Sequence, residues 1–137
     1  MLKNVITICC TLLILHVCSA QKQDSLSVNT EKVYELFDVQ KKPEFPGGET
    51  ALYRFLSDSI TYPAEARSKN IRGMAVITFV VETDGSVSTV TIVKDPGWEM
   101  GNEAARVVKL MPKWTPAEKE GKPVRVKFML PIRFTLQ

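Results

Sequence analysis

The stretch Val124-Arg125-Val126-Lys127-Phe128-Met129-Leu130-Pro131-Ile132-Arg133-Phe134-Thr135-Leu136 decides the fold. Every even-numbered residue in it is apolar, whereas the odd-numbered residues include three cations, a proline and a threonine. Because side chains of a β-strand point alternately to opposite faces, this pattern predicts one long strand with a single buried face. Pro131 has no N–H to give to a neighbouring strand, so at least part of the strand is expected to lie at a sheet edge.

An edge strand that carries cations has two interpretations. Charged residues at an edge normally discourage aggregation. An unpaired edge also accepts a partner's extended peptide, which gains main-chain hydrogen bonds by adding a strand. The pattern alone leaves both open.

The residues before this strand predict a mixture of strands and helices. Further strands are expected at residues 33–39, 74–81 and 87–93, with a hairpin turn at Asp84-Gly85 between the last two. Apolar residues at helical spacing predict helices at 51–60 and 100–111, and Pro63 suits the first turn of a short helix towards Asn70. Residues 116–123 are expected to form a charged, solvated turn.

Composition excludes several kinds of chemistry. The chain has 137 residues, with 45% hydrophobic and 24% charged residues, which are ordinary values for one globular domain. All three cysteines and the single histidine lie in the first twenty residues. The other 117 residues, with a net charge of +2, therefore exclude histidine and thiol chemistry and zinc sites of the usual kind. A net charge this small does not indicate a nucleic-acid-binding surface, and no cofactor is expected.

The N-terminus has the pattern of a secretory signal peptide. Lys3 gives a positive start, residues 5–17 are mostly apolar, and Cys18-Ser19-Ala20 places small residues before an expected cleavage site. We expect a signal peptide at 1–20, a polar, flexible lead-in at 21–30 and one domain at 31–137. The alternatives are an uncleaved anchor, although a bilayer needs about 20 apolar residues, and a lipoprotein modified at Cys18.

No residue pattern indicates an enzyme. Glu118 and Glu120 are a carboxylate pair, but their loop lacks the apolar neighbours that would raise one pKa for acid–base work. Gly47-Gly48 opens a helix and lacks the lysine of a phosphate loop, so a helix-starting turn is the simpler interpretation. We therefore expect a non-enzymatic protein with no catalytic, metal or cofactor residues.

A set of short motifs occurs in a fixed order along residues 62–136, namely Tyr62-Pro63, Ala66, Gly73, Asp84-Gly85, Glu103-Ala104, Val107-Val108, Met111-Pro112-Lys113-Trp114, Pro116, Gly121-Lys122-Pro123-Val124 and Leu130-Pro131-Ile132-Arg133-Phe134. In this order and spacing, these residues resemble the C-terminal domain of TonB, the energy transducer that serves outer-membrane receptors of Gram-negative bacteria. Relatives often carry an acidic cap at the start of the third helix, where this chain has Gly101, and glycine is expected to serve as the cap instead.

The resemblance implies an α+β fold with two layers, in which helices pack on a small antiparallel sheet. It implies binding of the TonB box, a short segment at the N-terminus of a receptor, as a strand added beside residues 124–134. The implied contact residues on the strand are Val124, Arg125, Val126, Lys127, Phe128, Met129 and Arg133. Those around the Tyr-Pro motif are Thr61, Tyr62, Pro63 and Arg67, whereas Trp114, Gly73 and the even-numbered strand residues are expected in the core.

Three functions remain open at this point. The first is an exported, stand-alone periplasmic domain that binds receptor peptides. The second is an anchored energy transducer whose N-terminal segment stays uncleaved, which would bring in the proton-driven complex of the inner membrane. The third is a module that self-associates through its free edge.

Overall fold

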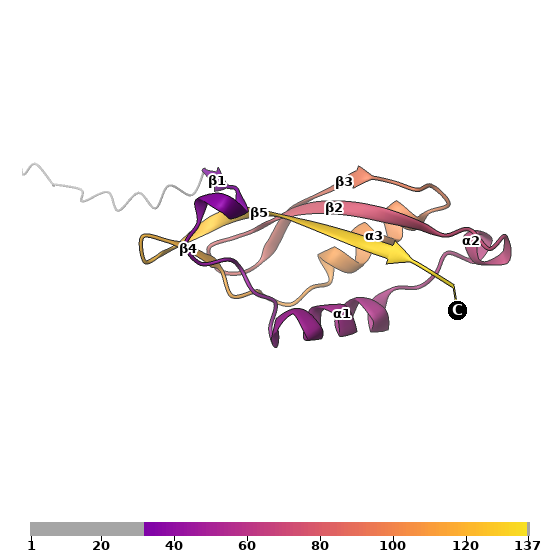
Figure 1. Ribbon diagram of the computed structural model, residues 1–137, viewed down its shortest axis with the longest axis horizontal. Helices are drawn as coiled ribbons and strands as arrows, with labels where there is room; N and C mark the ends of the chain where they lie inside the picture. The colour runs from indigo at the N-terminus through magenta and orange to yellow at the C-terminus, as the bar shows by residue number, and fades with distance from the viewer. Residues whose placement is uncertain (1–31, 137) are drawn as a thin grey trace, which may run out of the picture.

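The computed structural model describes residues 32–136, and the expected signal peptide and lead-in lie outside this range. Figure 1 shows an elongated domain of helices and strands. The elements in chain order are β1 (Val33–Tyr34), the 3₁₀ helix η1 (Leu36–Asp38), α1 (Gly48–Ser59), α2 (Ala64–Ser68), β2 (Gly73–Val81), β3 (Val87–Lys94), α3 (Met100–Lys109), β4 (Ala117–Lys119) and β5 (Lys122–Phe134).

The sheet is built on β5, which has the predicted alternation of buried and exposed residues. Its strand order is β1-β5-β2-β3, and β4 pairs with the start of β5. The pairing of β2 with β5 is antiparallel and runs without a shift from Gly73 opposite Phe134 to Val81 opposite Val126. The expected α+β architecture is thus confirmed.

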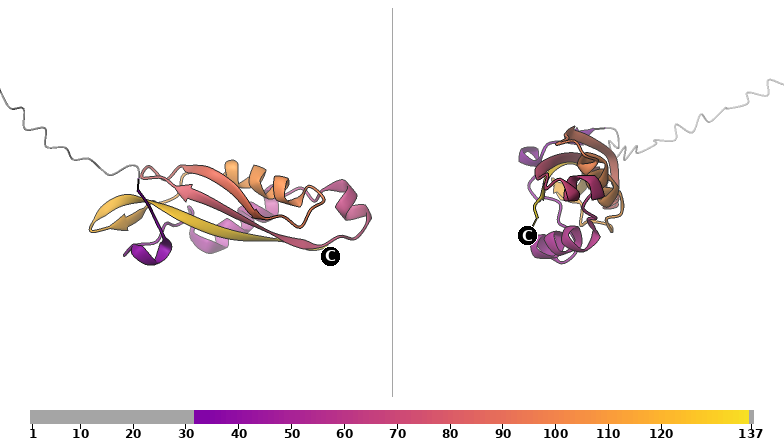
Figure 2. Two further views of the ribbon diagram at one scale, coloured as in Figure 1. Left: turned by 90° about the horizontal axis from the view of Figure 1, so that it is seen from above. Right: turned by 90° about the vertical axis from the view of Figure 1, so that its right-hand side faces the viewer.

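Helices α1 and α3 supply the second layer, against the face on which Val126, Leu130, Ile132 and Phe134 of β5 are buried (Figure 2). The amphipathic pattern of residues 51–60 has its expected result, because Leu52 and Leu56 are buried while Arg54 and Asp58 are exposed. In α3, Met100, Ala104 and Val107 are fully buried. Trp114 joins the same core, with its ring 5.5 Å from that of Phe79.

Two expectations about local structure are wrong in part. The stretch 33–39 holds only a two-residue strand, followed by η1, with Phe37 84% exposed. The stretch 116–123 is a solvated turn only at Glu120 and Gly121, because Ala117 is fully buried and β4 forms a tight hairpin with β5. Charged residues on both sides of that hairpin hide its strand character in the sequence.

The start of α3 is also built differently from our expectation. Gly101 lies inside the first turn of the helix and does not cap it. The acidic group comes from Asp95, whose Oδ1 accepts hydrogen bonds from the N–H groups of Gly97 at 2.8 Å and Gly101 at 3.2 Å. A β-carbon at Gly101 would lie 2.5 Å from this carboxylate, so glycine is needed for the close approach.

Candidate functional site

One edge of the sheet is open along most of β5. Parallel strand β1 covers that edge only opposite Arg125 and Val126. From residue 127 to residue 134, β5 pairs with β2 on one side and has no strand partner on the other among residues 32–136. The expectation of a partial edge position is therefore confirmed. We call residues 127–134 the open edge.

Pro131 indicates which main-chain groups face outward from this edge. In an antiparallel pair, alternate residues direct both N–H and C=O to the neighbouring strand, and a proline fits only where these groups point away. Pro131 lies opposite Val76 of β2. The odd-numbered residues Lys127, Met129, Pro131 and Arg133 therefore direct their main-chain groups outward, and only Pro131 lacks an N–H.

The opposite edge of the sheet, formed by β3, has a different shape. Its pairing with β2 shifts register twice, between Val76 and Ile77 and between Thr78 and Val80, and each shift places one extra residue in β3. Thr89, within the second bulge, has a φ of 49°. Bulges bend a strand and interrupt its ladder, which protects an edge from pairing. The β5 edge, by contrast, is regular.

Helix α1 forms a wall beside the open edge, and two side chains of α3 hold its C-terminal end. Glu103 accepts a hydrogen bond from the N–H of Thr61 at 2.8 Å, and Arg106 donates to the carbonyl of Ser59 at 3.0 Å. Glu103 and Arg106 also pair with each other at 2.6 Å. The hydrogen bond from Arg106 is the main cause that lowers the pKa of Glu103, so the carboxylate stays ionised in this role.

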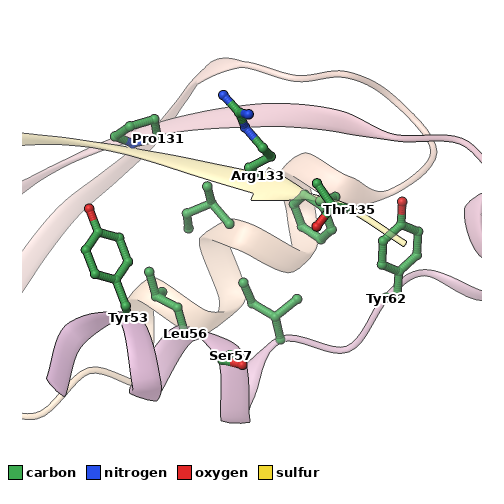
Figure 3. Close-up of a pocket in the computed structure, with 10 residues that line it drawn as sticks. Tyr53, Leu56, Ser57, Tyr62, Pro131, Arg133 and Thr135 are labelled. Atoms are coloured by element: carbon green, nitrogen blue, oxygen red, sulfur yellow. The ribbon is translucent and has the colours of Figure 1, made fainter. Parts of the chain in front are cut away.

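Two adjacent pockets lie between this wall and β5. The first, of about 450 Å³, is bounded by Pro131, Ile132, Arg133, Phe134 and Thr135 on the strand side and by Tyr53, Leu56, Ser57, Ile60 and Tyr62 on the other. In Figure 3, Tyr53 and Leu56 point from α1 towards β5, whereas Arg133 points away from the helix.

The second pocket, of about 340 Å³, continues along residues 128–131. Leu52, Phe45 and Trp114 line it, and Tyr53 and Pro131 border both pockets. Tyr53 is 57% exposed and donates a hydrogen bond from its hydroxyl to Glu49 at 3.1 Å. That bond raises the pKa of Tyr53, so the phenol remains neutral. The two pockets form a mostly apolar groove beside a row of outward-facing main-chain groups.

The helix side of this groove is not predicted by the sequence pattern. The pattern of residues 51–60 predicts a buried stripe, and Tyr53 and Ser57 lie outside that stripe. Nothing in their spacing indicates that they face a strand edge, because the position of α1 depends on contacts with α3, more than 40 residues later in the chain.

Four of the expected contact residues lie on the open edge, namely Lys127, Phe128, Met129 and Arg133. The side chains of Lys127, Met129 and Arg133 are exposed, and Phe128 is half-buried against Trp114, 5.1 Å between ring centres. Neither Lys127 nor Arg133 forms an ion pair within 4 Å in residues 32–136. The solvent-exposed face of the open edge is thus cationic near both ends.

The other three strand residues lie outside the open edge. Val124 pairs with Ala117 of β4, and Val126 is fully buried beside β1. Arg125 forms an ion pair with Glu82 at 2.6 Å, with only 20% and 23% of the two side chains exposed. Hydrogen bonding from Arg125 is the main cause that lowers the pKa of Glu82. This position makes Arg125 a link between β5 and the end of β2.

The residues around the Tyr-Pro motif lie at the far end of the groove. The hydroxyl of Tyr62 donates to the carbonyl of Ile71, and its ring meets Phe134 edge to face at 5.7 Å, so Tyr62 connects the segment that follows α2 to β5. Thr61 and Pro63 line a neighbouring hollow next to α3. Arg67 is exposed and borders a further hollow beside Thr135.

Within residues 32–136 no three metal-binding side chains come together. None of the helices in this part of the chain has the length and apolar character needed to cross a membrane.

Comparison with known proteins agrees with this fold. Residues 58–136 match the family model of the Gram-negative bacterial TonB protein C-terminal region. A solution structure of the Helicobacter pylori TonB C-terminal domain aligns at a TM-score of 0.50 with 22% identity, covering 64% of this chain and 79% of that one.

Two further solution structures are similar. A second one of the H. pylori domain has a TM-score of 0.49 and 24% identity, covering 63% of this chain and 90% of that one. The Pseudomonas aeruginosa TonB C-terminal domain has a TM-score of 0.43 and 18% identity, covering 57% and 81%. Among curated proteins, none matches. Because the family model covers more than half of the sequence, this chain belongs to the TonB C-terminal family.

Proposed function

We propose that this chain is a periplasmic binding domain that takes up an extended segment of a TonB-dependent outer-membrane receptor as a strand beside the open edge of β5. The observation that carries the proposal is the difference between the two edges. The edge of β5 is regular and offers three N–H and four C=O groups over residues 127–134, whereas β3 is bulged twice. Only a regular edge allows consecutive main-chain hydrogen bonds to an added strand.

The groove beside the edge supports the same function. An added strand directs every second side chain towards α1, where the pockets of about 450 and 340 Å³ lie. Main-chain bonds supply affinity that does not depend on sequence, and the pockets supply selection. No catalytic group is required for this activity, which fits a domain of the TonB C-terminal family.

Location in the periplasm and a role in energised transport are parts of the same proposal. They rest on the secretory pattern of residues 1–20 and on family membership. Mass spectrometry of the protein purified from its native membrane and periplasmic fractions tests the first part. A chain that begins at Gln21 supports export with cleavage, whereas an intact Met1 supports the anchored transducer.

The binding function is tested by titration. The domain, labelled with ¹⁵N, is mixed with peptides from the N-termini of receptors encoded in the same genome, and amide shifts are followed by NMR. We expect saturable shifts concentrated at residues 127–134. Shifts that depend only on protein concentration would favour self-association through the same edge, and an absence of shifts across the full receptor set would refute peptide binding.

A further inference from the structure

The two pockets beside the open edge have a spacing that restricts which peptides fit. Residues 128–131 border one pocket and residues 131–135 the other, so the midpoints of these stretches lie three to four residues apart. At the rise of a β-strand this separation is about 12 Å. Side chains on one face of an added strand recur at about 6.6 Å and 13 Å, so positions i and i+4 match the pockets.

The two pockets are divided at Tyr53 and Pro131. Tyr53 and Pro131 border both pockets, and Tyr53 is held in place by its hydrogen bond to Glu49. A side chain at position i+2 of an added strand meets this division. A small or hydroxyl-bearing residue fits there, whereas a large apolar residue does not.

Charge restricts the other face of the peptide. Lys127 and Arg133 lie six residues apart on the exposed side of β5, and neither has an ion-pair partner within 4 Å in the described part of the chain. Directly opposite side chains in neighbouring strands come within about 5 Å of each other. Acidic residues on the solvent-exposed face of an added strand therefore complement the positive charge at both ends of the open edge.

On the basis of the proposed function, we propose that the groove selects extended acidic peptides that carry two apolar side chains four residues apart on one face and a small residue midway between them. This pattern reads the same in both strand directions, so it does not depend on which way the peptide runs. We assign the segment to another chain, because within residues 32–136 the strand that reaches this edge, β1, enters it from the Lys122 end and leaves it at once through η1.

Synthetic nine-residue peptides test this selection. The reference peptide has leucine at the third and seventh positions, glutamate at the second and eighth, and threonine elsewhere. A second peptide of identical composition has its leucines at the third and sixth positions, which places one of them on the solvent-exposed face of the added strand. We expect the reference peptide to bind about tenfold more tightly, because only it buries both leucines.

Two variants of the domain assign the effect to a pocket. Ser57 is an exposed residue that lines the larger pocket, so Ser57→Trp fills it without altering the core. Thr50→Trp adds the same side chain at an exposed position on α1 that borders neither pocket. The preference between the peptides should fall to nearly onefold in Ser57→Trp and stay near tenfold in Thr50→Trp.

The outcomes separate this inference from the function on which it rests. Equal binding of both peptides, with amide shifts at residues 127–134, would overturn the selection rule and leave strand addition standing. An unchanged preference in Ser57→Trp would also overturn it, because the larger pocket would then play no part. No binding by these peptides or by receptor peptides would overturn the proposed function itself.

Discussion

Replacing Met129 by proline removes one outward N–H from the open edge. The residue is 55% exposed and lies opposite Thr78, at the same parity in the strand as Pro131. The chain thus already contains a proline in an equivalent position two residues later. Because the outward N–H is not part of the ladder with β2, and because Phe128 is already in a strand as a residue before proline should be, the fold is expected to tolerate the change.

The magnitude follows from the number of donors at this edge. Lys127, Met129 and Arg133 supply the only outward N–H groups between residues 127 and 134. Losing one leaves a carbonyl of the bound peptide without its partner, which costs about 1 to 3 kcal/mol. We therefore expect Met129→Pro to weaken peptide binding by about tenfold, equivalent to about 1.4 kcal/mol, while stability falls by about 1 kcal/mol or less.

Isothermal titration calorimetry with a receptor peptide measures the affinity, and urea unfolding measures the stability. The control is Met129→Ala, which removes the same side chain and retains the N–H. The reciprocal change, Pro131→Ala, adds a donor to the edge and should tighten binding. Equal affinities for Met129→Pro and Met129→Ala would refute the assignment of the outward groups.

Two other predictions concern the stability of the scaffold. Gly85 has a φ of +87°, and a β-carbon there would lie 1.9 Å from the carbonyl oxygen of Trp114, so Gly85→Ala should lower the free energy of unfolding by about 3 kcal/mol or more. Gly97→Ala, with a φ of +86° and open space around it, isolates backbone strain and should cost about 1 to 2 kcal/mol; similar losses in urea unfolding would show that the close contact is unimportant. The hydrogen bond from Arg125 lowers the pKa of Glu82 below its ordinary value of 4.5, so this carboxylate contributes stability above pH 4.5 that disappears as the pH falls through its folded pKa. Acid unfolding of Glu82→Gln should therefore show a flatter loss of stability below pH 4.5 than the unchanged protein, and parallel curves would contradict this linkage.

Alternation in residues 124–136 was enough to predict the long strand and its buried face, because a strand with one face in the core imposes a period of two. The prediction of β2 and β3 likewise followed from β-branched residues around a turn at Asp84-Gly85. These features are local, so they are visible in a single sequence.

The unpredicted features depend on contacts between distant segments. The hairpin of β4 is stabilised by backbone hydrogen bonds between Glu118 and Lys41, far away in the chain. Similarly, β1 covers Arg125 and Val126, which shortens the edge that the sequence suggested. Neither the charges nor the spacing of apolar residues at 116–123 indicates these pairings.

For the same reason, the sequence predicted only the strand side of the candidate site. Strand residues such as Met129 and Arg133 followed from the alternation and from the family resemblance. Predicting that Tyr53 and Ser57 line the groove required knowledge of where α1 lies, and that position depends on Glu103 in another helix. A pattern within one element does not contain the distance to another element.

Amide hydrogen exchange at single residues, measured with and without bound receptor peptide, tests strand addition most directly. In the free domain the N–H groups of Phe128, Leu130 and Ile132 bond to β2 and should exchange slowly, whereas those of Lys127, Met129 and Arg133 should exchange fast. Strand addition predicts that the peptide slows exchange at these three odd-numbered residues and leaves the even-numbered residues unchanged. Protection that appears on β3 instead, or no new protection at a saturating peptide concentration, would contradict the account.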